Sequence, residues 1–80
     1  MNLLLNYATS AAGSLRVEIQ DAPGKAIPGF AITDMPELFG DEFDAEVAWK
    51  ENPNVAALAG KVVRLRVLLR DADLFSLRTD

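Results

Sequence analysis

The chain has 80 residues, half of them apolar and a quarter charged, with a formal net charge of −4 at pH 7. This length predicts one domain, residues 1–80, and the acidic balance argues against nucleic acid and anionic membrane surfaces as partners. The chain contains no cysteine and no histidine, which excludes disulfides, thiolate catalysis and the commonest ligands of transition metals.

Apolar residues at every second position, the pattern of half-buried strands, recur along the chain. The predicted strands are, in chain order, 2–8, 15–20, 30–33, 43–50, 63–70 and 74–78. The small residues of Ser10–Ser14 are expected to close the first hairpin, and Asp71–Asp73 to form a tight connection into the last strand. Gly24 suits a turn between the second and third strands, because glycine adopts a positive φ without strain.

Six short strands joined by turns predict an all-β fold, an antiparallel two-sheet sandwich of the jelly-roll-like kind. Leu4 and Leu68 interrupt the polar faces of their strands and need a cover. We therefore expect a module that is incomplete as a monomer, and that forms a homo-oligomer or docks on a larger body. Opposite charges on the outer faces are expected to pair across strands: Glu18, Asp44 and Glu46 with Arg64, Arg66 and Arg70.

An acidic cluster at residues 34–46 supplies the candidate metal ligands. Calcium binds several oxygen atoms from a flexible loop, and Asp34, Asp41 and Asp44 are the ligands that we assign to it. The spacing does not match an EF-hand, and a solvated loop followed by the outer face of a strand explains the same residues. A carboxylate pair would also serve glycoside hydrolysis, but so short a chain cannot enclose a sugar, and we predict no enzyme activity.

Exposed aromatic side chains are the candidate carbohydrate contacts, because sugar rings pack on aromatic faces. Trp49 and Tyr7 are the residues of choice, and Phe75 is weighed in the same way. The competing interpretation is a place in the core. Trp49 shares its predicted strand face with Val47 and Phe43, which favours the core.

Three blocks of sequence carry a resemblance to a known family. They are AAGSLRVEIQDAPGKAIPGF at 11–30, EVAWK at 46–50 and LAGKVVRLRVLLRDADLFSLR at 58–78. Together, in this order and spacing, they resemble the C-terminal β-sandwich of bacterial proteins related to glycoside hydrolase families 32 and 43. In that family a five-bladed β-propeller bears the catalytic carboxylates, and a jelly-roll-like module follows it.

The resemblance implies a non-catalytic module that braces a missing catalytic domain or contacts carbohydrate, with no catalytic residue of its own. The alternative is a stand-alone, lectin-like protein whose ligand sits on the acidic loop through calcium. Met1–Asn6 lacks the positive charge and the apolar length of a secretory signal, and no stretch is long enough for a transmembrane helix. Localisation therefore stays open, since the parent of such a module can be a secreted protein.

Overall fold

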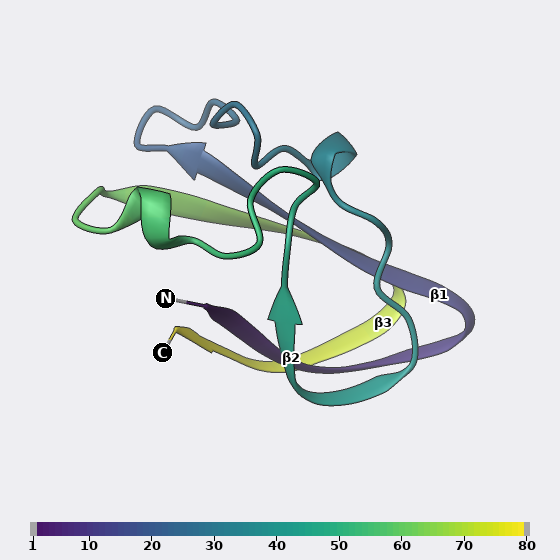
Figure 1. Ribbon diagram of the computed structural model, residues 1–80. Coiled ribbons are helices and arrows are strands. Elements are labelled where there is room, and N and C mark those ends of the chain that lie inside the picture. Colours follow the sequence, from purple (N-terminus) through teal and green to yellow (C-terminus); the bar gives the residue numbers. More distant parts are fainter. Residues whose placement is uncertain (1, 80) are drawn as a thin grey trace.

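The computed structural model describes residues 2–79 and is all-β, as the sequence predicts. Three strands, β1 (Leu3–Asp21), β2 (Asp41–Val47) and β3 (Val63–Thr79), form an antiparallel sheet in the order β2-β1-β3 (Figure 1). Short 3-10 helices, η1 (Ile32–Asp34) and η2 (Ala56–Leu58), lie in the connections. The described residues thus form one three-stranded sheet, where the sequence predicts about six strands in two sheets.

The predicted hairpin at Ser10–Ser14 and the predicted connection at Asp71–Asp73 are both wrong. The predicted strands 2–8 and 15–20 form one continuous strand, and so do 63–70 and 74–78. β1 runs through the first segment and β3 through the second. The two segments lie at the same level of the β1–β3 ribbon, where the pairing register shifts between Thr9 and Ser14 and Asp71 adopts a φ of 46°. These irregularities bend both strands together instead of reversing the chain.

The bend folds the β1–β3 ribbon over, so that its two halves face each other (Figure 1). One hydrophobic cluster fills the space between them and contains residues from both halves of β1. Its buried members are Leu3, Leu5, Tyr7, Leu15, Val17, Ile19, Phe30, Met35, Val47, Trp49, Val55 and Leu58. Burying one large aliphatic side chain contributes about 1.5–3 kcal/mol, so this cluster is the main source of stability.

The second half of β1 is covered on one edge by an irregular segment, residues 25–38, instead of the predicted strand at 30–33. Backbone hydrogen bonds join Leu15 to Leu38 in both directions, and the N–H of Ile19 donates to the carbonyl of Phe30. Since consecutive residues of a strand direct their backbone groups to opposite edges, the odd-numbered residues of this half point away from β3.

Val17 lies between these backbone contacts, and side chains satisfy its backbone groups. The Val17 N–H lies 3.1 Å from the Met35 sulfur, and its carbonyl accepts a hydrogen bond of 3.0 Å from the Trp49 indole Nε1. The Trp49 ring also meets Phe30 edge to face, with 5.2 Å between ring centroids. Trp49 is therefore a core residue, as predicted. Its indole N–H also supplies the hydrogen bond that a neighbouring strand would otherwise donate to Val17.

A β-bulge in β2 overturns the prediction that Phe43 is buried. Leu5 pairs with Ala45 but Tyr7 pairs with Glu42, so β2 carries an extra residue at this point, and Asp44 has a φ of 50°. A bulge reverses the alternation of faces beyond it. Val47 is buried as predicted, whereas the Phe43 side chain is 90% exposed.

The predicted charge pairing and the predicted exposure of Leu4 and Leu68 hold in part. Arg66 lies 3.7 Å from Glu18, as expected, whereas Asp44 pairs with Arg78 at 3.1 Å. Leu4 is buried, but Leu68 is 45% exposed.

Glu18 is a buried carboxylate that the surrounding donors keep ionised. The Gln20 side chain donates to one oxygen at 2.8 Å, and the N–H of Ile32 donates to the other at 3.3 Å. The pKa of Glu18 lies below its ordinary value, chiefly because of the Gln20 hydrogen bond; burial opposes this effect, and Ile32 and Arg66 add to it. Glu18 thus ties β1 to η1 and to β3.

We expect acid to weaken the fold through Glu18. Its pKa is lower in the folded than in the unfolded chain, so its contribution is present above the unfolded value of about 4.3 and is lost as pH falls through the folded value. Urea unfolding between pH 7 and pH 3 should show a smaller loss of stability for Glu18→Gln than for the wild type. Glu46→Gln removes the same charge at an exposed position of β2 and is the matched control. Equal profiles for Glu18→Gln and the wild type would contradict this role.

Candidate functional site

The two aromatic residues that the sequence nominates for carbohydrate contact lie in the core. Trp49 is 3% exposed and Tyr7 is 4% exposed. The Tyr7 hydroxyl donates to the carbonyl of Phe39 at 3.2 Å, and burial, with a smaller effect of the Glu42 charge, raises the pKa of Tyr7. In this arrangement neither ring presents a face to a sugar.

The three aspartates nominated for calcium serve different elements. Asp34 accepts a hydrogen bond from the N–H of Ala31 at the start of η1, Asp44 pairs with Arg78, and Asp41 lies at the beginning of β2. Across residues 2–79 no three acidic side chains come together in a group that could hold a metal ion.

A groove on the outer face of the sheet is the most distinctive surface feature. The β2 bulge at Phe43 and Asp44 lies beside Asn6 of β1, and β3 is irregular at the same level, where Asn6 pairs with Ser76 but Tyr7 pairs with Leu74. The extra residue of β3 is Phe75. Two irregularities on opposite sides of one strand therefore hold two phenylalanines at the surface, Phe43 at 90% and Phe75 at 68% exposure.

The middle of the groove is polar and fixed. The Asn6 amide nitrogen donates to the Ser76 hydroxyl at 2.6 Å, and its oxygen accepts from the N–H of Asp44 at 2.8 Å. Because a backbone N–H can only donate, this second contact fixes the orientation of the amide. The groove has a volume of about 480 Å³ and is lined by Asn6, Tyr7, Ala8, Asp41, Glu42, Phe43, Phe75 and Ser76.

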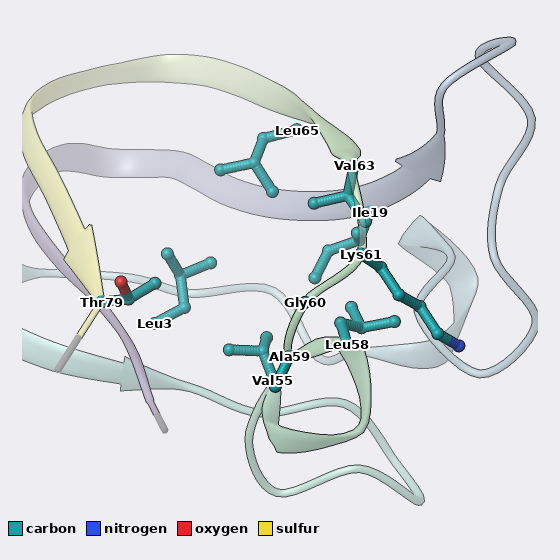
Figure 2. Close-up of a pocket in the computed structure, with 10 residues that line it drawn as sticks. All are labelled: Leu3, Ile19, Val55, Leu58, Ala59, Gly60, Lys61, Val63, Leu65 and Thr79. Carbon is teal, nitrogen blue, oxygen red and sulfur yellow. The ribbon is translucent and has the colours of Figure 1, made fainter.

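A second, apolar pocket of about 390 Å³ opens where the two ends of β3 diverge. Figure 2 shows Leu3 and Thr79 on one side of it, Val63 and Leu65 on another, and the Lys61 side chain extending away. Val55 and Leu58, beside η2, complete the wall. Lys61 is the one titratable residue of its described lining, which is mainly apolar and includes the core residues Leu3 and Ile19.

β3 is the exposed side of the molecule. Its large apolar side chains with at least a third of their surface exposed are Leu65, Leu68, Leu69, Phe75 and Leu77. Leu65, Leu69 and Leu77 share the core face of β3, whereas Leu68 lies on its outer face. The sequence indicates Leu68 as exposed. Leu65, Leu69 and Leu77 are exposed because β3 lies at the edge of the sheet, and Phe75 because of the irregularity beside Asn6.

No helix within residues 2–79 is long and apolar enough to cross a membrane. Comparison of the chain with protein-family models, with curated proteins and with solved structures gave no match.

Proposed function

We propose that this chain is a non-catalytic module of a carbohydrate-active protein, and that it contacts carbohydrate through the groove between Phe43 and Phe75. The observation that carries the proposal is the pair of exposed rings on either side of Asn6, each held outward by an irregularity of its strand. Exposed phenylalanine is costly in water, and β-bulges commonly re-aim side chains at functional sites.

The chemistry of the groove suits a sugar chain. The apolar C–H faces of two successive sugar rings would pack on Phe43 and Phe75. Their hydroxyls would exchange hydrogen bonds with Asn6 and Ser76 in the middle of the groove and with the carboxylate of Glu42 at its rim. An open, shallow groove admits the middle of a polymer as well as its end.

The architecture is in keeping with the family that the sequence resembles. The two facing halves of the bent ribbon would supply parts of both layers of a jelly-roll-like sandwich, and further strands would come from a partner or from a neighbouring domain. In this proposal the catalytic carboxylates belong to that neighbouring domain, and the chain described here has none.

The test is a binding assay with soluble xylan, arabinan, fructan and mixed-linkage β-glucan, by isothermal calorimetry and by electrophoresis through polysaccharide-containing gels. One of these polymers should bind the wild type. Phe43→Ala and Phe75→Ala should each weaken that binding by about tenfold, the loss of one ring contact. Phe39→Ala is the matched control, since Phe39 is also exposed but lies outside the groove.

Unchanged affinity in the Phe43→Ala and Phe75→Ala variants would place any carbohydrate contact elsewhere. Absence of binding to all four polymers would overturn the proposed contact.

A further inference from the structure

The outer edge of β3 is a long strand edge with no pairing partner among residues 2–79. β3 has 17 residues. Its even-numbered residues 64–70 oppose Ser14, Arg16, Glu18 and Gln20. These are the β1 residues whose backbone groups face β3, so the even-numbered residues of β3 direct their own backbone groups to β1. The backbone groups of Leu65, Val67 and Leu69 therefore point outward, away from the sheet. Such an edge readily pairs with another strand.

The side chains on the core face of β3 are apolar along nearly the whole strand. The register with β1 places Val63, Leu65, Val67, Leu69, Ala72, Leu74, Leu77 and Thr79 on this face. Leu65, Leu69 and Leu77 are each 38–45% exposed, because no further strand covers them. Three residues of this face, Val63, Leu65 and Thr79, also line the apolar pocket of Figure 2.

We propose that β3 pairs with β3 of a second copy, antiparallel and about a two-fold axis at the bend. The irregular residue Asp71 lies near the middle of β3, so the bends of two copies coincide, as those of β1 and β3 already do within one chain. The core faces then match in order: Val63 with Thr79, Leu65 with Leu77, Val67 with Leu74, and Leu69 with Ala72 of the second copy.

The pairing produces one bent sheet of six strands, in the order β2-β1-β3-β3-β1-β2. A two-fold axis perpendicular to the sheet keeps the concave face of both copies on the same side, so the two cores become continuous. The two ends of β3 that border the open pocket, near Val63 and Thr79, meet their counterparts in the second copy. The contact buries the surface that one chain leaves exposed, and it is isologous and closed.

Assembly stops at two copies because the other edge of the sheet is protected. β2 has only seven residues, and four of them are acidic: Asp41, Glu42, Asp44 and Glu46. It also carries a bulge at Asp44. Shortness, like charges and bulges are the features that prevent edge-to-edge pairing in natural sheets.

The charges on the outer face make the register testable. Arg70 would lie opposite Asp71 of the second copy and one step from its Asp73, a favourable contact that occurs twice near the axis. Arg64 would lie opposite Arg78 of the second copy, an unfavourable contact near each end of the strand. Within residues 2–79 neither Arg64 nor Arg70 forms an ion pair, so each can be changed without breaking one in the single chain.

The two charge reversals Arg70→Glu and Arg64→Glu are the test, because they change the net charge equally and are expected to act in opposite directions. Sedimentation equilibrium should show a monomer–dimer equilibrium for the wild type. Arg70→Glu should raise the dissociation constant by about tenfold or more, and Arg64→Glu should lower it severalfold. Thermal melts at one dilute concentration verify that all three proteins are folded.

Three results would overturn the pairing. The first is a wild type that stays monomeric up to about 1 mM, the weak end of specific association. The second is an assembly of more than two copies. The third is a pair of charge reversals that shift the dissociation constant in the same direction. The carbohydrate proposal is tested independently, by the effect of Phe43→Ala and Phe75→Ala on polysaccharide binding.

Discussion

Replacing Trp49 by alanine should lower the free energy of unfolding by about 3–5 kcal/mol, the range for removing a buried tryptophan. The change leaves a cavity beside Phe30 and removes the donor that satisfies the Val17 carbonyl at 3.0 Å. A domain of this size has about 5–10 kcal/mol in total, so the variant should lose a large share of its stability. Urea unfolding followed by circular dichroism measures the effect.

Trp49→Phe separates the two contributions. Phenylalanine keeps most of the ring packing but cannot donate a hydrogen bond, so the Val17 carbonyl loses its partner. We expect this variant to lose about 1–3 kcal/mol, less than the alanine variant. A loss below about 1 kcal/mol for Trp49→Ala would mean that Trp49 does not anchor β1 in the manner described.

Replacing Gly13 by alanine should cost about 1–3 kcal/mol or more, the range for overpacking a tight site. Gly13 lies at the bend of β1, and a Cβ atom built there would collide with the backbone carbonyl oxygens of Arg70 and Asp71. Those atoms belong to the partner strand and cannot move without opening the ribbon. Thermal unfolding measures the loss.

Ala12→Ser is the matched control for Gly13→Ala. Ala12 is the exposed neighbour at the same bend, and its substitution should change stability by less than about 0.5 kcal/mol. A Gly13→Ala variant as stable as this control would show that β1 and β3 do not approach each other as closely as the bend requires.

The sequence predicts most of the strand segments, with 30–33 as the exception, and predicts their connections poorly. The alternation in Leu15–Gln20 and Val63–Leu69 correctly places both in strands. It assigns the buried face of the first correctly, whereas Leu65 and Leu69 of the second are 38% and 44% exposed. The errors lie at Ser10–Ser14 and Asp71–Asp73, where small and acidic residues indicate a turn. These residues are equally suited to a bend in a continuous ribbon, and the difference depends on the pairing of β1 with a strand more than 40 residues away, which no local pattern reports.

The groove between Phe43 and Phe75 is missed for the same reason: local sequence patterns do not report how strands pair. Counting every second residue places Phe43 with Val47 in the core, and one extra residue at Asp44 reverses that assignment. Aspartate tolerates a positive φ better than most residues, which is the single local signal of the bulge. Phe43 and Phe75 lie near Asn6 only because of the registers of both β2 and β3 with β1, which the sequence alone does not reveal. The sequence therefore nominates Trp49 and Tyr7 instead.

The expectation of a partner stays a prediction. It is based on Leu4 and Leu68, two apolar residues on polar strand faces, of which Leu4 is buried and Leu68 is exposed. The structure adds the location of the uncovered surface. It lies along β3, the last strand of the sheet, and includes Leu65 and Leu77. A chain that cannot complete its core with its own strands is expected to complete it with another copy.

Hydrogen exchange at the outward-pointing amides of β3 tests this central claim most directly. At high dilution the amides of Leu65, Val67 and Leu69 should exchange rapidly, while those of Arg66 and Leu68, which face β1, stay protected. As the protein concentration rises through the dimer range, the three outward amides should become as protected as their neighbours. Protection that is already complete at dilution, or that never appears, would contradict an edge left open in one chain and closed by a second.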